Sequence, residues 1–182
     1  NIGDNNIFRE GCTIHTGTKP GSETRIGSRN MFMNATHVAH NCIVGNDVIY
    51  VGYAGTAGYC EIFDNVLISG LVGIHQFCRV AIISGGSVFS KDIPPFMMAE
   101  GRNGGVKMIN KVGLQRAGFS TETISVIKQI FRIYYRSGLI PTNALERIRT
   151  ELPQIPEVRE FIHFCETSKK GVISAQVEGH RS

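Results

Sequence analysis

The chain has 182 residues, of which 42% are apolar, and a formal net charge of +4, which suits one globular domain or one domain with an appended subdomain. No apolar run approaches the roughly 18 to 20 residues that span a bilayer, and the sequence shows no charged-then-apolar leader, so we expect a cytoplasmic protein without stable membrane insertion. Basic residues concentrate after residue 100, but they are interleaved with glutamates and no Trp is present, so nucleic-acid binding is not expected.

A six-residue repeat dominates the first half of the chain. Twelve of the fourteen residues met in steps of six from Ile2 to Val80 are large and apolar. This period fits three short strands per coil, each with one inward aliphatic side chain. The repeat therefore predicts a single-stranded, left-handed parallel β-helix, a triangular prism filled by these residues: Ile2, Phe8, Ile14, Pro20, Ile26, Phe32, Val38, Val44, Tyr50, Thr56, Ile62, Ile68, Ile74 and Val80.

Two further positions of the repeat favour small residues. Gly or Ala often follows the aliphatic residue, as at Ile26-Gly27 and Val44-Gly45, which we assign to tight backbone geometry or limited volume at corners. Four places after the aliphatic residue, the side chain is usually small, and four of the five cysteines occupy this position. We interpret them as buried apolar residues that stack one coil apart; an oxidative crosslink between neighbours is conceivable, but a reducing cytoplasm disfavours it. These cysteines are Cys12, Cys42, Cys60 and Cys78.

Two segments interrupt the repeat. Residues 20–25 (PGSETR) replace a regular hexad while preserving the register, which predicts a loop that leaves the prism. The six-residue repeat ends after Val80. Pro94 and Pro95 cannot continue a paired strand or enter a helix interior. We therefore predict a β-helix over residues 1–93 and a carboxyl-terminal helical domain over residues 94–182.

The period beyond the prolines is helical. Ser120 is a suitable N-cap for an apolar stripe that ends at Ser137-Gly138, which predicts a first long helix. Further helices are predicted over residues 142–152 and from Pro156 to about Ser168. From about Ser174 no apolar stripe remains, so the last residues are expected to fray.

Histidines projecting from the prism are candidates for chemistry. His37 and His40 are three residues apart across a corner, and His75 lies on a later coil. Steps of 18 residues, one full coil, place Gly58 and then Gln76 in the column of His40. A glycine beside a candidate base leaves a notch in which backbone N–H groups could stabilise a developing oxyanion.

Other polar residues of this region are assigned by the same count. Asn41 shares a column with Tyr59 and Phe77. His15 lacks comparable neighbours in this register, so we predict that it is a surface residue of its corner.

Six segments in this order resemble a known family: IGDNNIFREGCTIHTGT (2–18), HVAHNC (37–42), GIHQFC (73–78), DIPPFMMAEG (92–101), GLQRAGFS (113–120) and IYYRSG (133–138). The chain resembles the UDP-N-acetylglucosamine O-acyltransferases, which carry out the first step of lipid A synthesis. The resemblance implies transfer of an (R)-3-hydroxyacyl group from acyl carrier protein to the sugar 3-hydroxyl of UDP-N-acetylglucosamine. It also implies a homotrimer with active sites between subunits, and we expect no cofactor and no metal.

The resemblance also implies roles for individual residues. His40 matches the general base, and the backbone N–H of Gly58 matches the oxyanion contact. Positions that line the substrate cleft are His37, Tyr59, His75 and Gln76. Asn110 and Arg116 match nucleotide-binding residues of the first carboxyl-terminal helix, which is consistent with guanidinium recognition of phosphate.

The chain departs from the family pattern in several places. Asn41 follows His40 where an aspartate usually orients the base, and an amide stabilises an imidazolium less than a carboxylate does. Tyr59 replaces a histidine, and Val112 replaces a carboxylate near the nucleotide. The segment between Cys78 and Asp92 is about three residues shorter than usual, and the family has several more coils before the position of Asn1.

These departures leave three alternatives open. The acceptor could be a 3-amino sugar nucleotide, because an amine needs less help from a base. The chain could be a degenerate relative without catalytic activity. Trimeric β-helices related to carbonic anhydrases bind zinc between subunits, and His37, His40 and His75 would be the ligands of such a lyase.

Overall fold

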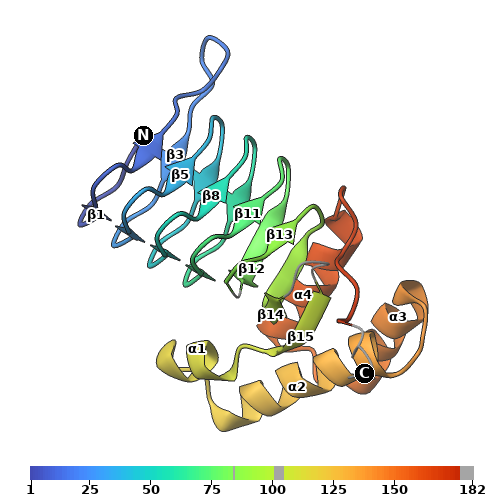
Figure 1. Ribbon diagram of the computed structural model, residues 1–182. Helices are drawn as coiled ribbons and strands as arrows, with labels where there is room; N and C mark the ends of the chain where they lie inside the picture. The colour runs from blue at the N-terminus through green and yellow to red at the C-terminus, as the bar shows by residue number, and fades with distance from the viewer. Residues whose placement is uncertain (84, 101–104, 177–182) are drawn as a thin grey trace, which may run out of the picture.

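The computed structural model describes residues 1–83, 85–100 and 105–176. Short parallel strands follow one another every six residues and stack into a triangular prism, with the helices gathered at its carboxyl end (Figure 1). The predicted parallel β-helix followed by helices is thus confirmed. Among the described residues, no helix is long and apolar enough to cross a membrane.

Each face of the prism is a ladder of parallel strands. The A face consists of β1 (Ile7–Phe8), β4 (Met31–Phe32), β7 (Ile49–Tyr50) and β10 (Leu67–Ile68). The B face consists of β2 (Thr13–Ile14), β5 (His37–Val38), β8 (Gly55–Thr56), β11 (Gly73–Ile74) and β13 (Val88–Phe89). The C face consists of β3 (Arg25–Ile26), β6 (Ile43–Val44), β9 (Glu61–Ile62) and β12 (Arg79–Ile83), whose far end also pairs with β10.

The interior of the prism is formed by the second residue of each strand. From Ile26 to Val80, every residue of the six-step series is buried, including Thr56. Residues of one face stack directly, as Phe32 does on Phe8 and on Tyr50, with 5.0 Å between ring centroids in both pairs. Burial of each such side chain stabilises the fold by roughly 1.5 to 3 kcal/mol. The predicted inward series is therefore confirmed from Ile26 to Val80, whereas Ile2 and Phe8 are exposed at the amino end and Pro20 is exposed in the loop.

The corners turn at a different residue from the one the sequence indicated. A left-handed backbone, with φ near +60°, recurs three places after the inward residue, for example at Arg29, Asn41 and Tyr59. The small residue directly after the inward one is explained by close approach instead. A Cβ on Gly27 would lie 2.5 Å from the carbonyl oxygen of Gly45 on the next coil.

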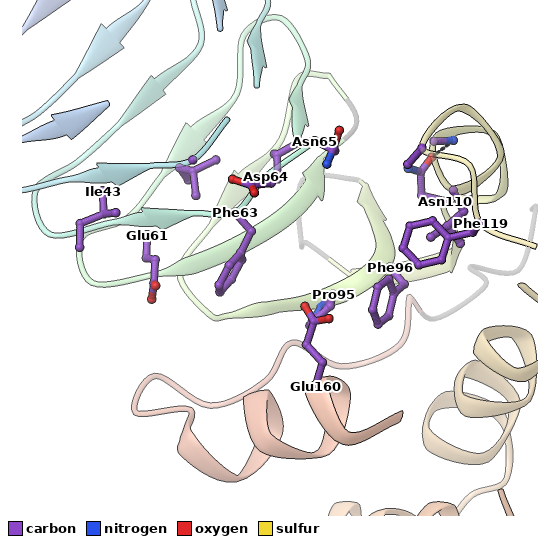
Figure 2. Close-up of a pocket in the computed structure, with 16 residues that line it drawn as sticks. Ile43, Glu61, Phe63, Asp64, Asn65, Pro95, Phe96, Asn110, Phe119 and Glu160 are labelled. Carbon is purple, nitrogen blue, oxygen red and sulfur yellow. Dashed lines mark hydrogen bonds between the residues drawn. The ribbon is translucent and has the colours of Figure 1, made fainter. Parts of the chain in front are cut away.

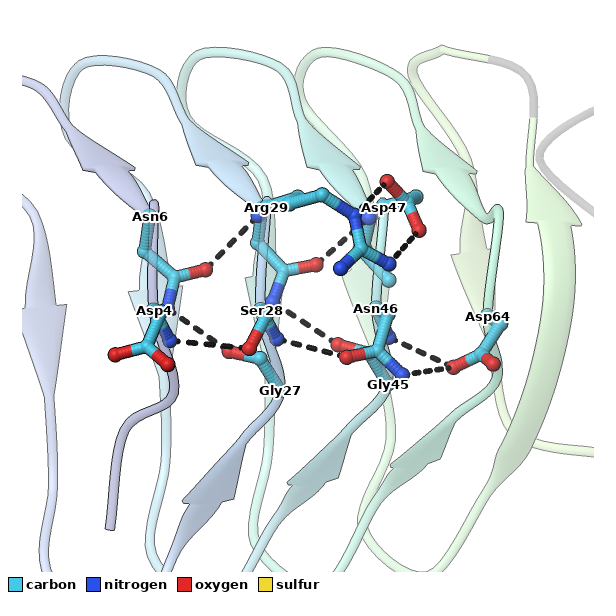
Figure 3. Close-up of polar contacts among 11 residues, drawn as sticks. Asp4, Asn6, Gly27, Ser28, Arg29, Gly45, Asn46, Asp47 and Asp64 are labelled. Atoms are coloured by element: carbon cyan, nitrogen blue, oxygen red, sulfur yellow. Dashed lines mark hydrogen bonds and ion pairs between the residues drawn. The ribbon is translucent and has the colours of Figure 1, made fainter.

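The corner between the C and A faces carries ladders of polar side chains (Figure 3). The N–H of Ser28 donates to Asn46 Oδ1 at 2.9 Å, and the N–H of Asn46 donates to Asp64 Oδ1 at 2.7 Å. Asn30 is buried, and its amide oxygen accepts from the Val48 N–H at 2.7 Å. These side chains satisfy backbone donors that the corner geometry leaves outside the strand ladders.

The cysteines in the small-residue column behave as predicted. All five cysteines are free; Cys42, Cys60 and Cys78 are buried, and Cys12 is half-buried. The thiol of Cys42 donates to the carbonyl of Ala57, and that of Cys60 donates to the carbonyl of His75. Burial raises the pKa of Cys78 to about 11, which keeps this thiol protonated at neutral pH.

The predicted loop at residues 20–25 is present between β2 and β3 and projects from the prism, at the top in Figure 1, but Arg25 already belongs to β3. Thr13 pairs with His37, which is 24 residues later, whereas His37 pairs with Gly55, which is 18 residues later. The coil that contains the loop therefore carries one additional hexad.

The prolines do not end strand pairing, contrary to the prediction. The stack continues beyond Val80, because β13 pairs with β11 and β14 (Ile93–Glu100) pairs with β12. Pro94 and Pro95 lie inside β14, where the register is irregular between the pairs Val80–Ile93 and Ile82–Met98. This irregularity accommodates two residues without a backbone N–H. The division at residues 93 and 94 stays an interpretation.

Within the described part of the chain, a hairpin and four helices complete the fold. Strand β14 pairs with the antiparallel strand β15 (Gly105–Ile109), which the hexad pattern did not indicate. Helices α2 (Thr121–Arg136), α3 (Pro141–Glu151) and α4 (Pro156–Thr167) confirm the three predicted from periodicity, with Ser120 capping α2. Helix α1 (Lys111–Arg116) has one buried residue and thus no apolar stripe.

The helices share one apolar core with the carboxyl end of the prism. Phe89, Ile93 and Met97 belong to the same buried cluster as Ile130 and Phe161. The segment after α4 is also paired, because the Val106 N–H donates to Ser174 O and the Gln176 N–H donates to Val106 O. The predicted fraying from Ser174 is therefore wrong for residues 174–176, and the rest of that prediction lies outside the described residues.

Candidate active site

His40 projects from the corner between β5 and β6 and is half-buried. Its Nδ1 lies 3.0 Å from Oδ1 of Asn41. The left-handed φ of +61° at Asn41 turns the chain at this point, and its backbone N–H donates to Thr24 Oγ1 at 2.8 Å. The corner thus presents an imidazole whose ring is held from one side by the neighbouring amide.

The amide oxygen of Asn41 accepts from more than the histidine. The backbone N–H of Thr18 lies 3.2 Å from Oδ1 of Asn41, and the Thr18 hydroxyl lies 3.0 Å from the same atom. A backbone N–H only donates, so the oxygen end of the amide faces Thr18 and His40. Nδ1 of His40 is then the donor, which leaves Nε2 with its lone pair.

Gly58 lies on the next coil beside the His40 ring. A Cβ at residue 58 would lie 2.4 Å from Cε1 and 2.7 Å from Nε2 of His40, so only glycine fits against the ring as it stands. Within the described part of the chain, the Gly58 N–H has no hydrogen-bond acceptor. The notch predicted from the 18-residue count is present.

Two aromatic rings continue the column above Asn41. The Tyr59 ring packs edge-on against His40, with 5.2 Å between centroids, and stacks on Phe77 at 4.9 Å. His75 and Gln76 precede Phe77 on the same coil, and both are exposed. His40, Asn41, Gly58 and Tyr59 are therefore brought together as predicted, with His75 and Gln76 one coil beyond Gly58.

His37 lies on the B face next to this corner. Its Nδ1 lies 2.7 Å from the Thr13 hydroxyl, and its ring packs edge-on against His15 at 4.7 Å. The prediction that His15 has no comparable neighbours is wrong, because the additional hexad shifts its coil by six residues. Burial and the nearby His15 lower the pKa of His37, so this imidazole is neutral near pH 7.

A cavity of about 650 Å³ adjoins the aromatic pair Tyr59 and Phe77. Its lining includes Arg79, Lys169 and Lys170. The ammonium group of Lys170 lies 5.6 Å from the centroid of the Phe77 ring. Arg79 is paired with Glu61 at 3.2 Å, whereas neither lysine forms an ion pair with a described carboxylate. The carboxylates of Glu61 and Asp92 also line this cavity, so the two lysines without a carboxylate partner are the cations that remain to bind an anionic group. No sequence pattern indicated these lysines, because they reach the prism from beyond α4.

Asn110 and Arg116 are not brought to the His40 corner of the same chain. Asn110 caps α1, where its Oδ1 accepts from the Gly113 N–H at 3.1 Å, and Arg116 is exposed at the end of that helix. Asn110 lines a separate cavity of about 460 Å³ between the C face, Phe96 and Phe119 (Figure 2). Val112 is 57% exposed.

The three histidines offered as zinc ligands do not form a metal cluster within one chain. Among residues 1–83, 85–100 and 105–176, no group of three or more His, Cys, Asp or Glu side chains is placed to hold a metal ion. His37 and His40 instead bond to Thr13 and Asn41 through their Nδ1 atoms.

Several known proteins resemble this chain. A family model described as UDP-N-acetylglucosamine O-acyltransferase, domain 2, matches residues 92–173. The chain is 39% identical over 176 residues to an acyl-[acyl-carrier-protein]--UDP-N-acetylglucosamine O-acyltransferase of Thiobacillus denitrificans, a match that covers 94% of this chain and 68% of that protein. The chain belongs to the UDP-N-acetylglucosamine O-acyltransferase family. A Synechocystis protein of the same name is 41% identical and is covered to 61% of its length.

Solved structures of this family superpose closely on the chain. The UDP-N-acetylglucosamine acyltransferase of Francisella novicida matches with a TM-score of 0.90 at 36% identity, covering 95% of this chain and 65% of that one. The Arabidopsis enzyme of the same name gives a TM-score of 0.90 at 31% identity, with the same coverage of 95% and 65%. The chain thus spans about two thirds of the length of its family relatives.

Proposed function

We propose that this chain transfers an (R)-3-hydroxyacyl group from acyl carrier protein to the 3-hydroxyl of UDP-N-acetylglucosamine, the first step of lipid A synthesis. The observation that carries the proposal is the arrangement of His40, whose Nδ1 bonds to Asn41 while Nε2 lies beside Gly58. A general base with a free lone pair and an adjacent N–H without an acceptor are the two groups that acyl transfer to a hydroxyl requires.

The reaction follows from these two groups. Nε2 of His40 takes the proton of the sugar hydroxyl as its oxygen attacks the thioester carbonyl. The carbonyl oxygen becomes negative in the tetrahedral intermediate and accepts from the Gly58 N–H. When the C–S bond breaks, the imidazolium returns the proton to the departing thiolate, so the products are the O-acyl sugar nucleotide and the carrier thiol. No redox partner is needed.

Side chains around the base would bind the substrates. We assign His37, Tyr59, His75 and Gln76 to the walls of the acceptor cleft. Lys169 and Lys170 lie beside Tyr59 and Phe77, where an ammonium group could pair with a phosphate of the sugar nucleotide or of the carrier's prosthetic group. Both substrates are water-soluble, and we infer that the reaction takes place in the cytoplasm.

An exposed apolar strip supports assembly into a trimer. Ile7, Met31, Ile49 and Leu67 form one outward column along the A face. Ile49 is 38% exposed and Leu67 is 39% exposed, and a contiguous apolar strip of this kind marks a protein interface. We propose that a second copy covers this strip. Asn110 and Arg116 of one subunit would then contact the nucleotide bound at the His40 corner of another.

The test is a transfer assay with purified chain, (R)-3-hydroxyacyl carrier protein and UDP-N-acetylglucosamine, with the product identified by mass spectrometry. Carriers charged with different acyl lengths are compared in parallel. We expect an alkali-labile ester on the sugar. An alkali-stable amide formed only with the 3-amino analogue would show that the acceptor is a 3-amino sugar nucleotide. The absence of product with both acceptors would overturn the proposed function.

A further inference from the structure

We propose that Thr18 is a positioning residue that fixes the Asn41 amide with its oxygen toward His40 and thereby selects the imidazole tautomer protonated on Nδ1. The proposal rests on the proposed function, in which Nε2 of His40 is the base. It names a residue that lies outside the prism, in the loop between β2 and β3.

An asparagine beside a catalytic histidine has a problem that an aspartate does not have. Both carboxylate oxygens accept, so either orientation of an aspartate draws the proton to Nδ1. An amide has one accepting end and one donating end. If the Asn41 amide turned around, its NH₂ would donate to Nδ1, the proton would move to Nε2, and His40 could not act as a base.

Thr18 distinguishes the two orientations of the amide. Its backbone N–H lies 3.2 Å from Oδ1 of Asn41 and its hydroxyl 3.0 Å from the same oxygen. With the amide reversed, the N–H of Thr18 would face the NH₂ group, and two donors cannot bond to each other. Only the orientation with the oxygen inward satisfies Thr18 and His40 together.

Contacts within the loop hold Thr18 beside Asn41. A Cβ on Gly17 would lie 2.1 Å from the carbonyl oxygen of Ser22, so the two arms of the loop approach as closely as backbone permits. The Lys19 N–H donates to Ser22 Oγ at 2.9 Å, which closes the turn. At its far end, Thr24 Oγ1 accepts from the backbone N–H of Asn41 at 2.8 Å. Both ends of the loop therefore contact Asn41.

Thr18 also contacts both residues beside the base at which this chain differs from the family pattern, Asn41 and Tyr59. Its hydroxyl lies 3.4 Å from the Tyr59 hydroxyl. Because the Thr18 proton is directed to Asn41, the Tyr59 hydroxyl is the donor in this contact. Tyr59 packs edge-on against His40, so one threonine holds both the amide and the ring that flank the imidazole.

Histidine ¹⁵N NMR tests the tautomer directly, without any need for turnover. The full chain is labelled, and the His40 signals are identified by their loss in His40→Ala. We expect the wild-type ring to be protonated on Nδ1, and Thr18→Pro, which removes the backbone N–H that distinguishes the two amide orientations, to introduce the Nε2-protonated form. Thr18→Val, which keeps this N–H and removes only the hydroxyl, should keep the Nδ1-protonated form. Thr16→Pro is the matched control, because Thr16 is exposed in the same loop and its backbone N–H has no acceptor within the described residues.

Kinetics provide the second readout. Thr18→Pro should lower kcat about 10-fold and leave KM for the sugar nucleotide unchanged, since the base is in the wrong tautomer while the cleft is intact. In an Asn41→Asp background the same change should cost less than about 2-fold, because a carboxylate has no wrong orientation. A wild-type ring protonated on Nε2, or a Thr18→Pro spectrum identical to wild type, would overturn the proposal. An inactive chain with the expected tautomer would refute the proposed function alone.

Discussion

The imidazole of His40 lies against the Cα of Gly58, on the adjacent coil, with room for hydrogen but not for a methyl group. A Cβ at residue 58 would lie 2.4 Å from Cε1 of His40, closer than non-bonded carbon atoms approach. The backbone of Gly58 is not in the left-handed region, so the restriction comes from the histidine and not from the turn. The His40 ring can therefore keep its position only while residue 58 has no Cβ.

Gly58→Ala is therefore expected to lower kcat at least about 100-fold while the chain stays folded, because the methyl group displaces the His40 ring from its position. The measurement is the transfer rate together with the far-ultraviolet circular dichroism spectrum. Gly73→Ala is the control, since a Cβ there would have its nearest neighbour at 3.8 Å. Full activity of Gly58→Ala would show that the His40 ring need not lie against residue 58 for transfer to occur.

His37 predicts a pH dependence of stability. Burial and His15 lower its pKa in the folded state below the usual value of about 6.5, so in acid the unfolded chain binds a proton that the folded chain does not. The free energy of unfolding should therefore fall as the pH drops below about 6.5, down to the lowered folded-state pKa. Chemical denaturation from pH 7 to pH 5 should give a shallower dependence in His37→Gln. His163→Gln, on the exposed side of α4, should keep the wild-type slope. An unchanged slope in His37→Gln would contradict the assignment.

The apolar strip on the A face predicts the oligomeric state. Leu67→Asp places a carboxylate in the proposed interface and should convert trimers to monomers, as measured by light scattering coupled to gel filtration. Leu139→Asp is a matched control, because Leu139 is 38% exposed and follows α2, outside the strip. Trimers that survive in Leu67→Asp would place the interface elsewhere.

The corner ladder predicts a stability effect distant from the active site. Asn30 is 1% exposed, accepts from the Val48 N–H, and donates to the carbonyl of Gly45 at 2.9 Å. Asn30→Ala leaves both backbone groups without their partner and should lower the free energy of unfolding by about 2 to 4 kcal/mol in urea denaturation. Asn34→Ala, at an exposed position, should change it by less than about 0.5 kcal/mol. Equal losses in the two variants would argue against the buried ladder.

The parts of the fold that follow from periodicity were predictable from the sequence. A strict six-residue repeat determines which side chain points inward and which residues share a column, so Val38, Cys42 and the pair His40–Gly58 could be placed by counting. The count fails where the repeat changes. On the coil before His37, the additional hexad places Thr13 beside it and not Lys19, the residue 18 positions earlier.

Contacts between distant segments left no periodic signal. Thr18 reaches Asn41 only because the loop folds back on the prism, and Lys170 reaches Phe77 only because the chain returns after α4. Helix α1 is too short to show an apolar stripe, and its first turn depends on one cap, from Asn110 to Gly113. Such features depend on tertiary placement, which neither propensity nor spacing encodes locally.

His40 is the proposed base of the acyl transfer, and the rate of a single turnover measures this role most directly. Wild type and His40→Ala are mixed with (R)-3-hydroxyacyl carrier protein and saturating UDP-N-acetylglucosamine, and formation of the O-acyl product is followed. We predict a loss of about 1,000-fold in His40→Ala with no change in fold, and none in His163→Ala. A transfer rate in His40→Ala equal to that of wild type would contradict the role of His40 as the base.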